Sequence, residues 1–169
     1  MTFIHFWGHD RFRLGDHAVF SQWYKSPMHY DGIMFPSAEH WMMYQKAVLF
    51  DDDRIADKIL NEPKQGVVKN LGRKVKGFDE KIWDDAKLDI VRFGTLLKFT
   101  QSLELERILL DTADAVLVEA SPYDSIWGIG MMGNHPDANN PDKWQGENLL
   151  GFVLMDVRSV LLGDSPTKL

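Results

Sequence analysis

The sequence contains no cysteine, which excludes disulfide bonds and thiolate metal sites. It also lacks the run of about 20 apolar residues that a membrane-spanning helix needs. The first residues, M-T-F-I-H-F-W, show no basic region followed by a long apolar stretch, so we expect no signal peptide. Together these absences predict a cytoplasmic protein in a reducing environment, with no membrane partner.

Motifs for common cofactors are missing as well. Neither G-x-x-x-x-G-K-[ST] nor G-x-G-x-x-G occurs, so nucleotide binding by the usual Gly-rich loops is not indicated. The six histidines are scattered without an H-E-x-x-H grouping. The sequence therefore predicts no metal site and no cofactor.

Net positive charge is absent too. The formal net charge is −6, which argues against a broad surface that grips the phosphates of duplex DNA or RNA. A small ligand or one displaced nucleotide remains compatible with this charge. Aromatic residues, in contrast, are plentiful, with six Trp and ten Phe, and aromatic side chains can hold flat rings.

Hydrophobic periodicity predicts mainly helices after the first fifth of the chain. We expect helices over 54–61, 64–71, 79–99, 103–111 and 147–162. Gly94, inside the longest of these, weakens that prediction locally. With no repeat or linker, the 169 residues predict a single domain over 1–169.

Strand signals are short. Residues 3–7 and 19–24 are aromatic, residues 9–18 are loop-like, and Asp31-Gly32 between two apolar runs predicts a β-hairpin. We therefore expect a small N-terminal β element. Residues 115–120 form a buried strand by length and β-branching. The expected fold class is mainly α with this β element and one or two short buried strands.

One stretch, F-P-S-A-E-H-W-M-M-Y-Q-K, combines a helix start with unusual chemistry. Ser37 follows Pro36 and is suited to cap a helix that begins at Ala38. On that helix Glu39 and Lys46 lie at nearly the same angle, with methionines between them. This stripe is either a core helix with a solvated charge at each end, or a reactive carboxylate and amine in apolar surroundings.

Two other segments allow a functional and a structural interpretation. S-P-Y-D-S-I-W-G-I-G follows the expected buried strand, and one turn there could present Asp124 and Trp127 together, or could simply be a structural turn. Residues 63–78 carry five basic residues and no acid, and form a solvated face or a phosphate-attracting patch. The patch contains Lys64, Lys69, Arg73, Lys74 and Lys76.

Four segments in order resemble the NADAR family, also called YbiA-like. They read F-P-S-A-E-H-W-M-M-Y-Q-K-A, L-G-R-K-V-K-G-F-D-E-K-I-W, L-V-E-A-S-P-Y-D-S-I-W-G-I-G and N-P-D-K-W-Q-G-E-N-L-L-G. The resemblance implies a mainly α, YbiA-like helical array. It also implies hydrolysis of N-glycosidic bonds in phosphoribosyl or ADP-ribosyl compounds, including riboflavin intermediates and ADP-ribosylated guanine in nucleic acid. Ile129 departs from the acid of the riboflavin-pathway branch, and Gln22 from a common Asn.

By position, the resemblance places Glu39, Trp83, Asp124 and Trp127 in the active site, and Lys46 matches the lysine of the family's Q-K pair. We predict Glu39, Asp124 and Lys46 as catalytic residues. The two carboxylates are expected to line one pocket with Trp127. The predicted substrate-binding residues are Trp23, Arg73, Trp83, Trp127, Gly128 and Asn148.

The chemistry that these residues suggest has two routes. A carboxylate can stabilise the positive charge on the sugar or activate water while a second group protonates the leaving amine. Alternatively, Lys46, with a pKa lowered by burial, can form an imine with the opened ribose. The alternative function is a non-catalytic module that binds ADP-ribose or NAD. The sequence leaves open the leaving group, the assignment of acid and base, and the oligomeric state.

Overall fold

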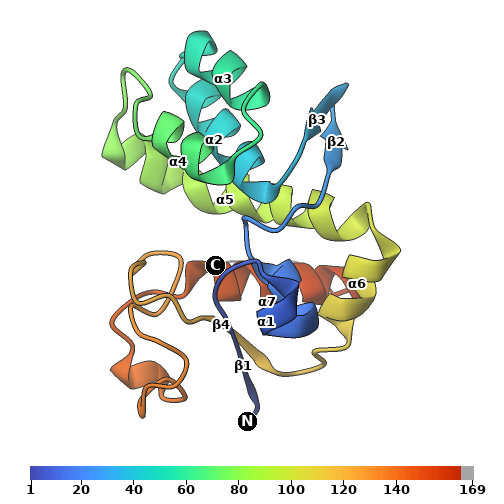
Figure 1. Cartoon of the computed structure of the whole chain (residues 1–169). Helices are drawn as coiled ribbons and strands as arrows, with labels where there is room; N and C mark the ends of the chain where they lie inside the picture. The colour runs from blue at the N-terminus through green and yellow to red at the C-terminus, as the bar shows by residue number, and fades with distance from the viewer. Residues whose placement is uncertain (165–169) are drawn as a thin grey trace. The chain divides into compact units, whose positions relative to one another are not determined.

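The structure is a computed structural model that describes residues 1–164. Its contacts divide the chain into two compact units, which are described separately. One unit is Gln22–Gln101, and the other combines Met1–Ser21 with the chain from Ser102 onward. Helices dominate and strands are few and short, which confirms the predicted mainly α fold (Figure 1).

The unit of Gln22–Gln101 begins with the predicted hairpin. Strands β2 (Met28–Tyr30) and β3 (Ile33–Phe35) pair antiparallel, and Met28 lies opposite Phe35. Asp31 and Gly32 between them both have positive φ, at 50° and 75°. This is the backbone that a two-residue hairpin turn requires, and Asp-Gly adopts it readily.

Helix α2 (Ala38–Leu49) is the centre of this unit. It packs against α3 (Asp53–Leu60), α4 (Gln65–Gly72) and α5 (Glu80–Thr100) (Figure 1). Gly94 does not interrupt α5. A Cβ at this position would collide with the indole of Trp41, so the glycine lets α2 and α5 approach closely.

The start of α2 is fixed by a buried chain of hydrogen bonds. Ser37 caps the helix by accepting from the backbone N–H of His40. The His40 ring donates from Nε2 to the carbonyl of Glu62 at 2.7 Å, because a carbonyl can only accept, and its Nδ1 then accepts from the Ser37 hydroxyl. Burial lowers the pKa of His40. The neutral imidazole therefore ties the first turn of α2 to the end of α3.

In the other unit, strand β1 (Phe3–Phe6) pairs in parallel with β4 (Val116–Glu119), with Phe3 opposite Val116. Helix α7 (Leu149–Leu161) packs on β4, and α6 (Leu103–Leu110) packs on α7. A short 3-10 helix, η2 (Pro141–Lys143), lies in the long segment between β4 and α7. The buried strand and the long irregular segment were both predicted.

The prediction for the N-terminal fifth is partly wrong. The loop-like residues contain helix α1 (Arg11–Leu14), capped by Asp10, and the 3-10 helix η1 (Gly15–Phe20). Val19 and Phe20 were expected in an aromatic β segment, but they are buried in η1. Single helical turns are too short to show periodicity. Strand β1 also pairs with β4 instead of joining the hairpin, which is a contact between residues far apart in the sequence.

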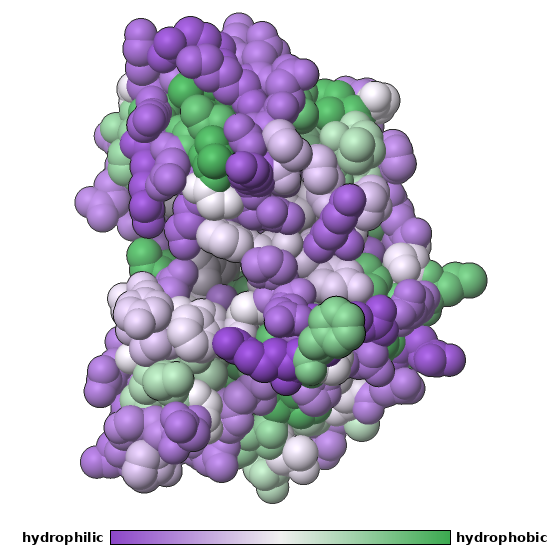
Figure 2. Space-filling model, viewed as in Figure 1, coloured by the Kyte–Doolittle hydropathy of each residue, from purple (hydrophilic) through white to green (hydrophobic). Residues whose placement is uncertain are grey.

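One face of the molecule is largely polar. On the face of the molecule in Figure 2 hydrophilic residues predominate, and apolar residues form small separate groups. No helix within residues 1–164 is both long and apolar enough to cross a bilayer.

Candidate active site

Helix α2 carries two of the predicted catalytic side chains. Glu39 lies in its first turn with 5% of its surface exposed, and Lys46 lies half-buried in its last turn. The Glu39 amide donates to the carbonyl of Gln22 at 2.9 Å, which fixes the segment before the hairpin against the helix start. A buried carboxylate at a helix N-terminus is stabilised by the helix dipole.

Two aromatic rings surround the amine of Lys46. Its Nζ lies 4.2 Å from the ring centre of Phe78 and 5.2 Å from that of Trp83, the predicted substrate-binding tryptophan. Burial, and secondarily the positive charge of Arg73, lower the pKa of Lys46. Lys46 forms no ion pair with another residue in 1–164. The expected combination of an amine with apolar surroundings is therefore present in this unit.

Helix α4 brings Arg73 to the same region. Gly72 contacts Met43 so closely that a Cβ there would collide with the methionine side chain, which sets the short distance between α4 and α2. Arg73 follows as the C-cap of α4, with its guanidinium exposed and donating to the side chain of Asn70 at 3.2 Å. The positive charge of Arg73, a predicted substrate-binding residue, thus acts on the amine of Lys46, the predicted nucleophile.

The basic run keeps its charges available. Within the part of the chain that the structure describes, Lys64, Lys69, Arg73 and Lys74 form no ion pair with a carboxylate. The indole of Trp23 lies beside the start of α4, near Gly66, and its carbonyl accepts from Gln65. The predicted residues Trp23 and Arg73 therefore lie at opposite ends of one basic helix.

Gln22, whose carbonyl accepts from the Glu39 amide, has a buried side-chain donor. The Nε2 atom of Gln22 is shielded from solvent and has no hydrogen-bond partner among residues 1–164. Buried polar atoms are nearly always bonded, so an unbonded amide next to a candidate site is notable. Gln22 is a departure from the resemblance and was not predicted as a site residue. Its contact with Glu39 runs through its backbone carbonyl.

In the other unit, Asp124 organises the turn after β4. Its Oδ1 accepts from the amides of Ile126 at 3.0 Å and Trp127 at 2.8 Å, and its own carbonyl accepts from Gly130 at 3.2 Å. Both of these amides donate to Oδ1. They fix the direction of the carboxylate, and so also that of its second oxygen, Oδ2. Asp124 and Trp127 are both half-buried. The turn brings the predicted carboxylate and tryptophan together, and it has a structural role as well.

Gly128 and Asn148 hold this loop on the free edge of β4. A Cβ at Gly128 would lie 2.7 Å from the carbonyl of Glu119, so only glycine fits there. Asn148 is fully buried, accepts from the Glu119 amide at 2.9 Å, and donates to the Leu117 carbonyl at 3.0 Å. These bonds occupy the edge of β4 opposite β1. A direct contact of Asn148 with substrate stays a prediction, and its observed bonds position the loop.

The loop also caps α7. Asn148 has a left-handed backbone, with φ 53°, and makes no side-chain cap. The amides of Leu149 and Leu150 instead donate to the carbonyls of Ile126 and Trp127. The helix therefore begins at Leu149, two residues later than predicted, because the positive φ at Asn148 ends the loop. The first amides of a helix need such acceptors.

Replacing Asn148 by alanine should destabilise the protein by about 2–4 kcal/mol, because two backbone groups of β4 lose their partners in a buried setting. Chemical denaturation measures this free energy of unfolding. Asn139→Ala, an exposed asparagine in the same long segment, is the control and should change stability by less than about 0.5 kcal/mol. An Asn148→Ala variant as stable as its control would show that these bonds contribute little.

Two residues of chemical interest were missed. Phe78 lies nearer the Lys46 amine than Trp83 does and packs edge-on against Phe50, but its proximity comes from the fold and not from spacing. Lys98 on α5 is buried, and burial lowers its pKa to about 7. Its place on the apolar side of α5, next to Phe99, was the signal available in the sequence.

The structure thus gathers the predicted residues in two groups, one within each unit. Glu39, Lys46, Trp83, Arg73 and Trp23 belong to the unit built on α2, and Asp124, Trp127, Gly128 and Asn148 belong to the loop of the other. The proximity of Glu39 to Asp124 stays a prediction. Among residues 1–164, no three His, Asp or Glu side chains are grouped so that they could hold a metal ion.

The comparisons with known proteins agree on one family. The model of the NADAR domain matches residues 5–162. An N-glycosidase of Acanthamoeba polyphaga mimivirus is 41% identical over 163 residues, which cover 92% of this chain and 94% of the relative. N-glycosidase YbiA of Escherichia coli is 33% identical over 87% of this chain and 81% of its own length.

A riboflavin biosynthesis protein of Vibrio vulnificus is 31% identical over 91% of this chain, which covers 38% of that longer protein. Among solved structures, the NMR structure of Escherichia coli YbiA superposes with a TM-score of 0.77 and 31% identity, covering 95% of this chain and 85% of YbiA. The fold is therefore the YbiA fold, as the sequence predicted. The chain belongs to the NADAR family.

Proposed function

We propose that this protein is an N-glycosidase that hydrolyses the bond between a nitrogen and a phosphoribosyl or ADP-ribosyl sugar. The observation that carries the proposal is the composition of α2. One helix presents a buried carboxylate, Glu39, and an amine, Lys46, whose pKa is lowered by burial. Two relatives that align over most of their length are named N-glycosidases, which supports the same reaction class.

The reaction requires stabilisation of charge on both sides of the bond that breaks. The sugar becomes positive at its anomeric carbon, and a carboxylate such as Glu39 or Asp124 can stabilise this charge or activate water. The turn at Asp124 supports this role, because Oδ1 is fixed by two amides and Oδ2 keeps a defined direction. The tryptophans supply flat apolar faces for a base.

A route through lysine is also consistent with the residues around Lys46. When a base is attached through an exocyclic amine, the sugar can open to an imine at C1. A neutral lysine amine then adds to C1 and releases the base as a free amine, and water hydrolyses the lysine imine to give the sugar and regenerate the lysine. The lowered pKa of Lys46 increases the fraction of neutral amine.

Phosphate groups of the substrate are assigned to the basic run of α4. Four cations there form no ion pair with residues in 1–164, so they can bind a diphosphate without first breaking a salt bridge. The proposal includes a cytoplasmic setting, which the cysteine-free composition favours.

Reversing the charge of Arg73 tests this assignment. Arg73→Glu should weaken ADP-ribose binding about tenfold, or about 1.4 kcal/mol, and should make the affinity less sensitive to salt. Isothermal titration at two salt concentrations measures both effects. Lys58→Glu, at an exposed lysine on α3, is the matched control. Equal weakening by the two variants would mean that only net charge matters, and would contradict binding at Arg73.

Release of free base is the test of the proposed reaction. The protein is incubated with ADP-ribosylated guanosine and, separately, with a ribosylaminopyrimidine phosphate, and the products are separated by chromatography. The proposal expects free base from at least one substrate. The alternative, a non-catalytic module, needs the same aromatic and cationic groups for binding but leaves both compounds intact.

A further inference from the structure

The unit that contains β1 and β4 has a pocket whose lining includes none of the residues predicted for the site. It has a volume of about 170 Å³ and lies where the parallel strands β1 and β4 end, with Phe6 and Ala120 in its lining. Trp7, Arg13 and Asn134 contribute to its walls. The carboxyl ends of parallel strands are a common place for ligands in sheets with helices. The volume is below the roughly 300–1,000 Å³ of complete small-molecule sites, so it suits one part of a larger ligand.

The pocket contains a cation and no acid. Arg13 lies over the ring of Trp7 at 5.9 Å, and its Nη2 donates to the Trp7 carbonyl at 3.3 Å. Arg13 forms no ion pair with any residue in 1–164. The neighbouring Arg11 differs, since it is paired with Asp16 and Glu104. In an acidic protein, an unpaired guanidinium in an acid-free pocket points to an anionic ligand.

An exposed aromatic ring stands beside the pocket. Tyr123 is 87% exposed, and its ring centre lies 5.8 Å from that of Trp7. Tyrosine presents a flat apolar ring with a polar tip, which suits it to binding sites that are partly open to water. A flat base can stack on such a ring. Tyr123 directly precedes Asp124, so a base bound there adjoins the loop assigned to catalysis.

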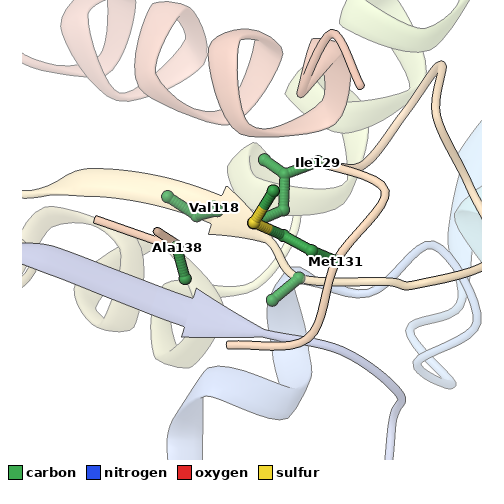
Figure 3. Close-up of a cluster of buried hydrophobic side chains, with 5 residues drawn as sticks. Val118, Ile129, Met131 and Ala138 are labelled. Carbon is green, nitrogen blue, oxygen red and sulfur yellow. The ribbon is translucent and has the colours of Figure 1, made fainter. Parts of the chain in front are cut away.

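Close packing and hydrogen bonds hold the wall of the pocket in place. Gly133 lies so close to β1 that a Cβ there would be 3.0 Å from the Cβ of His5. His5 Nε2 lies 3.4 Å from the carbonyl of Ala138, and Trp144 donates to the same carbonyl at 2.9 Å. Beneath these contacts, a small apolar core holds the long segment against β4 (Figure 3). It consists of Val118, Ala120, Ile129, Met131 and Ala138.

We propose that this pocket binds one nucleotide unit, with its phosphate at Arg13 and its base stacked on Tyr123. The chemistry is that of an aromatic base with a phosphate, and it has two possible sources. The unit is either the adenylate part of an ADP-ribosyl substrate, whose phosphate then lies at Arg13 and not at the basic run of α4, or a nucleotide next to the reacting one in a strand. The connection to the substrate rests on the proposed function, but the binding of a nucleotide does not.

Calorimetry of the full chain tests the pocket with three probes, namely AMP, adenosine and ribose 5-phosphate. Arg13→Gln should weaken AMP binding about tenfold and leave adenosine unchanged, because adenosine has no phosphate. Tyr123→Ala should weaken AMP and adenosine by a similar factor and leave ribose 5-phosphate unchanged. The matched controls are Arg54→Gln, at an exposed arginine on α3, and Phe12→Ala, at an exposed aromatic that does not line the pocket. Both controls should bind AMP like the parent protein.

Turnover distinguishes the two sources. If the pocket holds the substrate's own adenylate, Arg13→Gln lowers kcat/KM equally for ADP-ribosylated guanosine and for the same base within a short oligonucleotide. If it holds a neighbouring nucleotide, only the value for the oligonucleotide falls. Absence of AMP binding, or AMP binding unchanged in both Arg13→Gln and Tyr123→Ala, overturns the proposal. AMP binding that depends on Arg13 and Tyr123 in a protein that releases no base would support the pocket and refute the N-glycosidase function.

Discussion

Replacing Glu39 by glutamine is expected to reduce base release by about 10²–10⁴-fold, the range that a general acid or base contributes. Glutamine has nearly the same size and keeps hydrogen-bonding atoms, but it cannot carry the charge or exchange a proton. Because Glu39 is buried, solvent screens the charge of its carboxylate only weakly. The measurement is the single-turnover rate at saturating substrate, together with substrate affinity, which should change little.

Two further variants are needed to interpret the rate of Glu39→Gln. Glu80→Gln, at an exposed glutamate in the first turn of α5, should keep the parent rate. Asp124→Asn removes the charge of the second carboxylate while the amide oxygen can still accept from Ile126 and Trp127. A large loss in both Glu39→Gln and Asp124→Asn would make both carboxylates participants. A parent-like rate in Glu39→Gln would remove Glu39 from the mechanism.

Borohydride added during turnover is expected to trap a covalent adduct at Lys46. The lysine has a pKa lowered by burial and by Arg73, so more of its amine is neutral and nucleophilic than for an exposed lysine. The adduct should be heavier than the parent peptide by the reduced sugar-phosphate fragment. Peptide mass spectrometry locates it, and Lys98, whose pKa burial lowers to about 7, is the competing lysine to be checked.

The pH profile provides a second readout of the same mechanism. The rate should rise with pH as Lys46 loses its proton. Removing the positive charge in Arg73→Gln should raise the pKa of Lys46 and move this rise to higher pH at saturating substrate. Lys46→Arg keeps the cation, removes the nucleophile and should lose about 10² or more of the rate. If no adduct forms and Lys46→Ala keeps a near-parent rate, Lys46 is structural and direct attack by water is the mechanism.

Helix caps and turn residues in the sequence correctly predicted where the neighbouring helices and the hairpin turn lie. Pro36 and Ser37 placed the start of α2 correctly, and Asp31-Gly32 placed the hairpin turn, because each depends on neighbouring backbone only. The cap at Asp79 likewise placed the start of α5. Helix α1 could not be predicted from periodicity, since one turn gives no repeat.

These local signals could not predict contacts between residues that are far apart in the sequence. The parallel pairing of β1 with β4 joins the start of the chain to a segment far along the sequence, and no local pattern encodes it. The surroundings of Lys46 illustrate the same limit for the site. Its stripe with Glu39 followed from helical geometry, whereas the rings of Phe78 and Trp83 and the charge of Arg73 come from α4, α5 and their connection. Asn148 was expected at the substrate, but its bonds to β4 became visible only in the folded chain.

The most direct measurement is a time course of base release from an ADP-ribosyl or phosphoribosyl N-glycoside, followed by chromatography and mass spectrometry. The proposed function predicts that free base and free sugar phosphate appear in equal amounts, that each protein molecule releases many bases, and that Glu39→Gln binds the glycoside but releases almost none. Recovery of the intact glycoside, bound by the parent protein and by Glu39→Gln alike, would contradict the enzyme and leave only a binding protein.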